Sequence, residues 1–125
     1  MLPGLFNVNM SITGPVLTYH LEMFSKTDLE GLMSDYADDA VFISEDEVLE
    51  GHDEIRGYVR GFVAGIDDQT VVFSLDEQIA VDDYTYIVWH AETPENEYKF
   101  ASDTFVVRNG EIVAQILAAN VSKKG

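Results

Sequence analysis

The sequence predicts a small α+β domain in which a curved β-sheet folds around three helices and encloses an apolar pocket. Two observations support this fold class. Apolar residues recur at the helical period as far as residue 66, and the pattern then changes to long β-prone segments separated by turn signals. The chain has 125 residues, 46% of them apolar, which suits one domain with a packed core. We expect an irregular lead-in over 1–14, a single domain over 15–121 and a frayed tail over 122–125.

Three amphipathic helices are expected before residue 67. The first begins at Gly14-Pro15, where a proline suits the first turn, and runs to Lys26. The second begins with the capping box Thr27-Asp28-Leu29-Glu30 and stops at Asp38-Asp39. The third follows Gly51, and its glycines at 57, 61 and 65 are expected to let a neighbouring backbone approach closely.

One short strand and four long ones complete the expected order, α-α-β-α-β-β-β-β. Ala40–Ser44 is the short strand, and an acidic loop follows it. Asp82-Asp83 and Asn109-Gly110 are turn signals, so the long strands should form an antiparallel meander with the helices on one face. The long strands are expected at Thr70–Val81, Tyr84–Glu92, Glu97–Arg108 and Glu111–Val121.

The expected sheet is apolar on both of its faces. On the third long strand, Tyr98, Phe100 and Val106 lie on one face, and Ala101, Phe105 and Val107 lie on the other. The helices cover only one face, and a sheet that is apolar on both sides needs a second cover. A homodimer that packs sheet on sheet is the simple solution.

The charge of the chain excludes several classes of partner. It carries 23 acidic residues against 7 basic ones, a formal net charge of −16. Such a chain repels nucleic-acid phosphates and anionic membrane surfaces, so we expect neither as a partner. The acids are spread along the chain, which indicates a solvated surface rather than a disordered tail.

The absence of cysteine excludes a disulfide scaffold, a thiolate zinc site and a cysteine nucleophile. It is compatible with a reducing cytoplasm, which is the expected location. The segment 1–13 has neither the basic start nor the apolar run of a signal peptide, and no stretch reaches membrane-spanning length.

Three polar residues stand where apolar ones are expected. His20, at the centre of the apolar side of the first helix, is either an acid–base group in the pocket or a buried structural histidine. Asp103 has apolar neighbours on its face, so it either donates a proton or orients a histidine, or else it is a structural carboxylate that accepts backbone N–H bonds. His90 shares a face with Tyr86 and Val88, and its candidate role depends on lying near Asp103; otherwise it is a rim residue.

Other polar residues are given lesser roles. Together, His20, His90 and Asp103 would make a metal site of two histidines and one carboxylate, but no tight spacing supports it and we expect no metal. His52 is expected to be an exposed first-turn residue without a role. The acidic loop from Glu45 to Glu50 lacks the ligand pattern of a calcium loop and is interpreted as solvated surface.

No cofactor motif is present, since the chain has neither a glycine-rich phosphate loop nor G-x-S-x-G. The expected partner is therefore a small apolar molecule held without a cofactor. Gln115 should face the pocket because it alternates with Val113 and Leu117. The residues expected to line the pocket are Tyr19, Phe24, Ser44, Tyr58, Tyr86, Val88, Phe105, Gln115 and Leu117.

Four stretches of the chain resemble one known family. They are Lys26–Leu32 with Tyr36–Phe42, then Leu49–Arg56, and near the end Ser102–Val113. They are similar to the nuclear transport factor 2-like superfamily, and more narrowly to its SnoaL-like polyketide cyclase and steroid Δ-isomerase branch. The resemblance covers roughly residues 15–120 and implies a cone-shaped, cystatin-like fold.

The resemblance also suggests roles for single positions. Steroid Δ-isomerases use an aspartate base, with a tyrosine and a protonated aspartic acid that bind the oxyanion. The tyrosine of the first helix falls on His20, the base on Ser44 and the protonated acid on Asp103. Without a carboxylate at position 44, two functions stay open. One is an isomerase, cyclase or lyase acting on an apolar carbonyl or hydroxyl compound; the other is a non-catalytic ligand-binding or dimeric accessory domain.

Overall fold

The computed structural model describes residues 6–7, 28–66 and 72–124. The first helix expected at 15–26 lies outside these residues. The described elements are β1 (Phe6–Asn7), α2 (Leu29–Met33), β2 (Tyr36–Ile43), β3 (Val48–Glu50), α3 (His52–Ile66), β4 (Val72–Val81), β5 (Tyr84–Glu92), β6 (Asn96–Arg108) and β7 (Glu111–Lys123).

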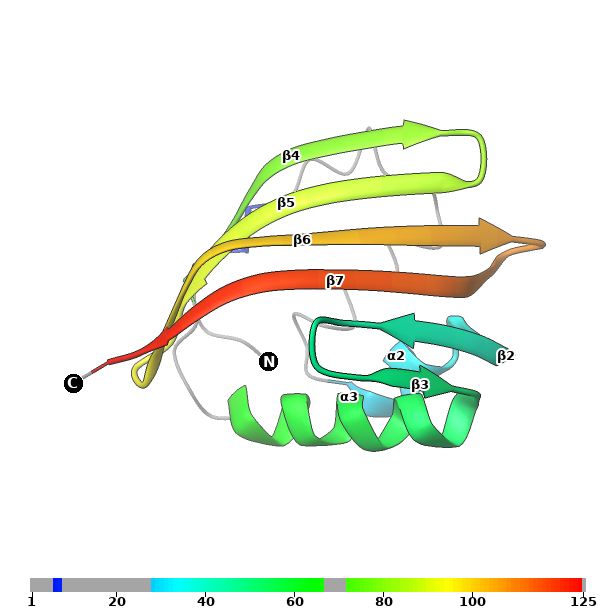
Figure 1. Ribbon diagram of the computed structural model, residues 1–125, viewed down its shortest axis with the longest axis horizontal. Coiled ribbons are helices and arrows are strands. Elements are labelled where there is room, and N and C mark those ends of the chain that lie inside the picture. The colour runs from blue at the N-terminus through cyan, green and yellow to red at the C-terminus, as the bar shows by residue number, and fades with distance from the viewer. Residues whose placement is uncertain (1–5, 8–27, 67–71, 125) are drawn as a thin grey trace.

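The expected α+β fold with a curved sheet is confirmed. The strands form one sheet in the order β1-β4-β5-β6-β7-β2-β3, and Figure 1 shows the four long strands β4 to β7 side by side, bending together toward one end. Strands β4 to β7 form the expected antiparallel meander. The sheet as a whole is mixed rather than antiparallel, because β2 runs parallel to β7 and β1 runs parallel to β4.

The turns of the meander are those that the sequence indicates. Asp82 and Asn109 have positive φ angles of 52° and 53°, and Gly110 has a φ angle of 77°. Asn109-Gly110 therefore adopts two consecutive left-handed residues, the geometry of a tight type I′ hairpin turn whose twist matches that of the strands. These two local turns fix the ends of β4, β5, β6 and β7.

The second helix is shorter than the sequence predicts, and the strand predicted at Ala40–Ser44, which is β2, is longer. Helix α2 is capped by Asp28, whose carboxylate accepts a 3.0 Å hydrogen bond from Gly31, and it ends at Met33 instead of continuing to residue 37. The N–H of Ile112 donates a 2.7 Å bond to the carbonyl of Asp35. This bond draws the chain into the sheet, so β2 begins at Tyr36 and not at residue 40.

Three further segments differ from the prediction. Part of the acidic loop is strand β3, which pairs with β2 as a hairpin. Strand β7 continues to Lys123 because Ser122 and Lys123 pair with β6, so the expected frayed tail is wrong for these two residues. Phe6 and Asn7 interrupt the expected irregular lead-in, since they pair with the free edge of β4.

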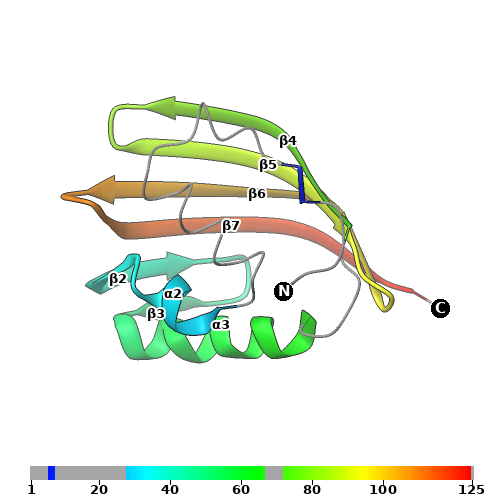
Figure 2. The same ribbon diagram turned by 180° about the vertical axis from the view of Figure 1, so that it is seen from behind.

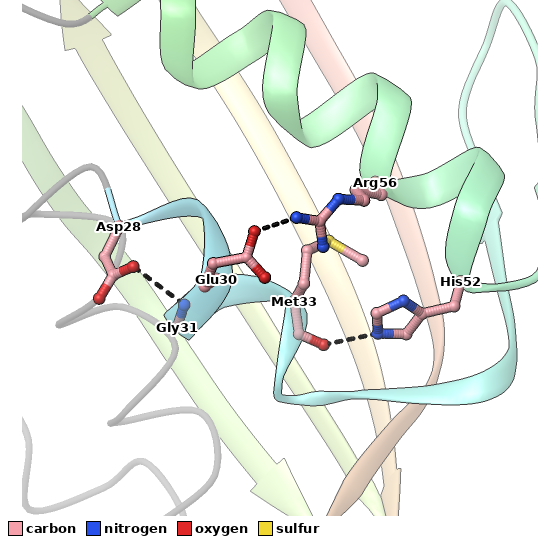
Figure 3. Close-up of polar contacts among 6 residues, drawn as sticks. All are labelled: Asp28, Glu30, Gly31, Met33, His52 and Arg56. Atoms are coloured by element: carbon pink, nitrogen blue, oxygen red, sulfur yellow. Dashed lines mark hydrogen bonds and ion pairs between the residues drawn. The ribbon is translucent and has the colours of Figure 1, made fainter.

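Helices α2 and α3 are held together by polar contacts that Figure 3 shows with the sheet behind them. The ring nitrogen Nε2 of His52 donates a 2.9 Å hydrogen bond to the carbonyl of Met33 at the end of α2. Arg56, one turn further along α3, forms an ion pair with Glu30. His52 is thus half-buried and joins two helices, whereas the sequence suggests an exposed residue.

The apolar side of α3 packs on the inner face of the sheet, as its period predicts. Ile55 and Val59 join the core beneath Phe42, Ile87 and Phe105. Figure 2 shows the molecule from behind, with α3 lying along the edge of the sheet that β3 and β2 form. Gly57 and Gly61 lie on the opposite side of α3, and an added Cβ would meet nothing within 4 Å. The expected close approach of a backbone is therefore wrong at these two glycines.

Candidate functional site

A cavity of about 350 Å³ lies between α3 and the inner face of the sheet. Its volume is in the range of small-molecule sites. Most of the described side chains around it are apolar or aromatic. They are Leu32, Tyr36, Phe42, Ser44, Glu45, Asp46, Glu47, Tyr58, Val59, Phe62, Val63, Phe73, Ile87, Trp89, Tyr98, Asp103, Phe105, Gln115, Leu117, Ala119 and Val121.

A chain of hydrogen bonds crosses the wall of the cavity from β2 to β5. The Tyr36 hydroxyl donates to Oε1 of Gln115, and Nε2 of Gln115 donates to Oδ1 of Asp103 at 2.9 Å. On the other side, Nε1 of Trp89 donates to Oδ2 of Asp103, also at 2.9 Å. Both carboxylate oxygens of Asp103 therefore accept N–H bonds, which is the pattern that stabilises an ionised carboxylate.

The negative charge of Asp103 raises the pKa of the neighbouring phenols Tyr36 and Tyr58. Burial raises the pKa of Tyr36 well above its usual value, and the negative charges of Asp103 and Asp35 raise it further. The Tyr36 hydroxyl consequently stays protonated and remains a donor to Gln115. The resemblance to steroid isomerases suggests a protonated acid at position 103, but the observed bonds are those of an acceptor.

Aromatic rings form two walls of the cavity. The first wall combines Phe42 of β2 with Tyr58 and Phe62 of α3, with ring centroids 4.7 Å and 6.5 Å apart in that order. The second wall combines the rings of β4, β5 and β6. It consists of Phe73, Trp89 and Tyr98, with centroid separations of 5.4 Å and 5.7 Å. Each wall presents aromatic surface to whatever enters the cavity.

Tyr58 and Tyr98 contribute one hydroxyl from each wall. Neither hydroxyl forms a hydrogen bond with another described residue, and both side chains are half-buried. Burial raises the pKa of Tyr58 to about 12, with smaller contributions from the charge of Asp103 and from Tyr98. Burial also raises the pKa of Tyr98. Both phenols are thus protonated donors available to a ligand oxygen at neutral pH.

The turn between β2 and β3 supplies the charged rim of the cavity. Ser44 opens this turn, and its N–H donates to the carbonyl of Glu47 at 2.9 Å. Glu45, Asp46 and Glu47 follow it and line the cavity. Glu45 is anchored across the rim, since its carboxylate accepts a 2.9 Å bond from the N–H of Ala119. The acidic loop is therefore part of the site, although the sequence suggests only solvated surface.

The structure brings six of the predicted site residues together and separates three others from them. Those that line the cavity are Ser44, Tyr58, Asp103, Phe105, Gln115 and Leu117. Tyr86, Val88 and His90 are not among the lining residues and lie on the opposite face of the sheet. Tyr19, His20 and Phe24 lie outside the described residues, so their roles stay predictions.

The expected proximity of His90 to Asp103 is wrong because of strand register. Asp103 pairs with Ile87, and directly paired residues of antiparallel strands point to the same face. His90 is an odd number of residues from Ile87 and points away, where its Nδ1 donates to Asp76 at 2.7 Å. This separation also excludes the considered metal site of His20, His90 and Asp103. No cluster of metal-ligating side chains occurs in the part of the chain that the structure describes.

Three important lining residues are absent from the sequence prediction. The sequence pattern assigns Tyr36 to the second helix, because its spacing from Leu29 and Leu32 also fits a helical period. Trp89 belongs to the alternating set that includes Ile87, the set opposite to the one predicted. Tyr98 turns inward because β6 has a bulge between Tyr98 and Phe100, and this shifts the alternation by one residue.

The sequence of the chain matches the model of a known family. The family model for the SnoaL-like domain matches residues 17–115 of the chain. The chain belongs to the SnoaL-like family. No curated protein matches it.

Solved structures share the fold at low sequence identity. A candidate polyketide cyclase from Sinorhizobium meliloti is 19% identical with a TM-score of 0.68, covering 84% of this chain and 94% of its own. A candidate ketosteroid isomerase from Kribbella flavida is 7% identical with a TM-score of 0.70, covering 88% of this chain and 78% of its own. A de novo designed protein with a curved β-sheet is 15% identical with a TM-score of 0.68, covering 84% of each chain.

These likenesses show the nuclear transport factor 2-like fold and no single activity. One of these neighbours is a de novo designed protein with a curved β-sheet, so the shared fold does not by itself imply a natural activity. Among the described helices, none has both the length and the apolar character needed to span a membrane.

Proposed function

We propose that this SnoaL-like protein is a small-molecule enzyme of the isomerase, cyclase or lyase type. Its substrate would be a largely apolar compound that carries a carbonyl or hydroxyl group. The observation that carries the proposal is Asp103, a carboxylate only 6% exposed in the wall of a mainly apolar and aromatic cavity. Buried carboxylates in such surroundings are characteristic of acid–base chemistry.

In this proposal, Asp103 accepts a proton and the cavity phenols bind the reacting oxygen. Asp103 lines the cavity, and a carboxylate oxygen can accept more than one hydrogen bond or proton. Asp103 takes a proton from a carbon next to the substrate carbonyl, while the Tyr58 hydroxyl donates a hydrogen bond to the oxygen on which charge develops. Return of the proton to another carbon completes an isomerisation without any other reactant.

A second candidate is ligand binding without chemistry. Ser44 stands where the resembling isomerases have their base, and both oxygens of Asp103 are already engaged. These bonds stabilise the ionised form of Asp103, so its carboxylate accepts a proton less easily. The cavity and its aromatic walls are equally suited to holding a ligand.

Hydrogen exchange into bicyclic ketones separates the two candidates. In heavy water, a tetralone or decalone that binds the protein should exchange hydrogens next to its carbonyl, and NMR measures the rate. Asp103→Asn is expected to lower this rate by about a hundredfold or more while leaving binding intact. A wild-type protein that binds these ketones but exchanges no faster than Asp103→Asn would leave only the binding function.

Asp103→Asn suits this test because the hydrogen-bond chain can reverse. The new amide group would accept from Trp89 through its oxygen and donate to Oε1 of Gln115 through its nitrogen, once the Gln115 amide flips. The flipped Gln115 would then donate to the oxygen of Tyr36. The variant therefore removes the charge and the base without removing the network.

We also propose that the protein acts as a homodimer that packs through the outer face of the sheet. A row of paired residues crosses six strands on this face, and we call it the outer row. It consists of Ile79, Tyr86, Thr104, Ile116, Ile43 and Val48. Its five large apolar members are between 36% and 59% exposed, and none of the six is charged. In a chain of net charge −16, an uncharged apolar row is where two copies can approach with least repulsion.

Analytical ultracentrifugation tests the dimer. The wild-type protein should sediment at twice the mass of the 14.0 kDa chain, and Ile116→Glu should sediment as a monomer. Gly57→Glu is the matched control, because it adds the same charge on the exposed side of α3 and should leave the dimer intact. A wild-type monomer, or a dimer that survives Ile116→Glu, would contradict the proposal.

A further inference from the structure

We propose that the cavity selects a cationic ligand, an apolar molecule carrying a quaternary or protonated ammonium group. The inference rests on the cavity being a ligand site, as argued above, and adds the charge class of the ligand. It follows from three features of the described lining: two aromatic walls, a buried carboxylate at one wall and acidic side chains at the rim.

The aromatic walls supply the first part of the argument. Eight of the lining side chains are aromatic, and six of them form the two walls that face the cavity from α3 with β2 and from the meander. The face of an aromatic ring is electron-rich and attracts cations, most strongly where water is excluded. Rings gathered from opposite sides of a cavity are the usual device for holding an ammonium group.

The charges around the walls have one sign. Asp103 is hydrogen-bonded to Trp89 and so places its charge beside the second wall. Asp46 and Glu47 lie close enough to the first wall to affect the ionisation of Tyr58 electrostatically. No lysine, arginine or histidine occurs among the described lining residues. A cation between the walls is thus attracted from both sides, whereas an anion is repelled from both.

The alternatives fit less well. A neutral apolar ligand would use the aromatic surface but gain no charge attraction from the four lining carboxylates, Glu45, Asp46, Glu47 and Asp103. A free metal ion would gain little from the apolar walls, and the described residues contain no group of metal-ligating side chains. An organic cation uses both the rings and the charges.

A pair of ligands of equal shape tests the proposal. The probes are para-(trimethylammonio)phenol and its uncharged isostere para-tert-butylphenol, each measured by displacement of the neutral dye N-phenylnaphthylamine. At low ionic strength and neutral pH, the cation should bind about tenfold more tightly than the isostere. Added salt should weaken binding of the cation and leave the isostere unchanged.

Variants of the rim and the wall sharpen the test. Asp46→Asn/Glu47→Gln should lower the preference for the cation about threefold, because these side chains make no hydrogen bonds with described residues and act through charge. The matched control is Asp39→Asn/Glu111→Gln, two exposed residues outside the lining that change net charge equally and should keep the preference. Phe62→Leu should weaken the cation more than the isostere, since it removes a ring but keeps an apolar side chain.

The outcomes separate this proposal from the proposed function. If the dye and the isostere bind but the cation binds no better, the cavity is a ligand site and the cation proposal is overturned. A preference that is unaffected by salt, by the rim variant and by Phe62→Leu overturns it as well. If neither the dye nor either probe binds, the cavity is no ligand site and both proposals fail.

Discussion

The two faces of the sheet are built from the same strands and have opposite chemistry. The inner face, toward α3, carries the cavity with the chain from Tyr36 through Gln115 and Asp103 to Trp89. The outer face carries the outer row, which has large exposed apolar side chains and no charge. Neighbours in sequence fall on different faces, as Asp103 and Thr104 do on β6. One residue of register therefore decides whether a side chain lines the cavity or is exposed on the outer face.

The contrast also extends to the polar groups of the sheet. Asp103 and Gln115 are buried on the inner face, where each has hydrogen-bond partners in the cavity wall. Buried polar groups cost several kcal/mol when they lack partners, so such a network is kept only where it is fully bonded. In the described residues, no buried side-chain nitrogen or oxygen lacks a partner. The inner face combines an aromatic-lined cavity with a hydrogen-bonded polar wall.

The largest expected effect comes from breaking the inner face at its core. Phe42 is 2% exposed and packs under Tyr58, whereas Ile43, the next residue, is 38% exposed on the outer face. Phe42→Ala should lower the free energy of unfolding by about 3–5 kcal/mol through loss of burial and formation of a cavity. Ile43→Ala should cost less than about 1 kcal/mol under conditions that keep the protein monomeric. Urea denaturation measures both, and equal losses would contradict the assignment of faces.

The next effect tests the polar wall. Gln115→Leu removes the two hydrogen bonds that Gln115 makes to Tyr36 and Asp103 while keeping a side chain of similar size. We expect a loss of about 2–3 kcal/mol in the free energy of unfolding, because one of these bonds involves a buried carboxylate. Asp103→Asn should cost clearly less, since the network can reverse. If Asp103→Asn proves the more damaging variant, the described bonding direction is wrong.

A smaller effect appears at high pH and again belongs to the inner face. Burial raises the pKa of Tyr58 from 10.0 to about 12, so the folded protein holds its phenolic proton more tightly than the unfolded chain does. Stability should therefore be constant below pH 10 as far as Tyr58 is concerned, and should fall as the pH rises from 10 toward 12. Chemical denaturation across this window should show a shallower fall for Tyr58→Phe. Tyr84→Phe, on the exposed end of β5, is the control and should follow the wild-type protein.

The smallest effect concerns the outward side of α3. Gly57 is exposed, lies in the middle of the helix and has nothing within 4 Å of an added Cβ. Gly57→Ala should raise the free energy of unfolding by about 0.5–1 kcal/mol, because alanine reduces the freedom of the unfolded chain and favours the helix. The same change at Gly110, where φ is 77°, should destabilise the protein. A destabilised Gly57→Ala would mean that a partner packs closely on this side.

Much of the fold can be predicted because its signals are local. The Asn109-Gly110 turn, the bounds of β5 and the apolar period of α3 follow from residues adjacent in sequence. The candidate site is only partly predictable. Asp103 and Gln115 stand out as polar residues within apolar patterns, whereas the sequence puts His90 on the wrong face because periodicity shows that two faces exist but not which strand positions share one. Tyr36 escapes prediction because helical and strand periods coincide over so short a segment.

By itself, the sequence determined the α+β class, the meander, the inward position of Asp103 and Gln115 and the acidity of the chain. The tertiary structure alone decided that β2 lies between β7 and β3, which brings Tyr36 to Gln115 across 79 positions of sequence. It also decided that the bulge in β6 turns Tyr98 into the cavity and that the acidic turn forms the rim. The physical reason is the same in each case. Hydrogen-bond pairing between distant strands sets the register, and register is a property of two segments together that neither segment contains alone.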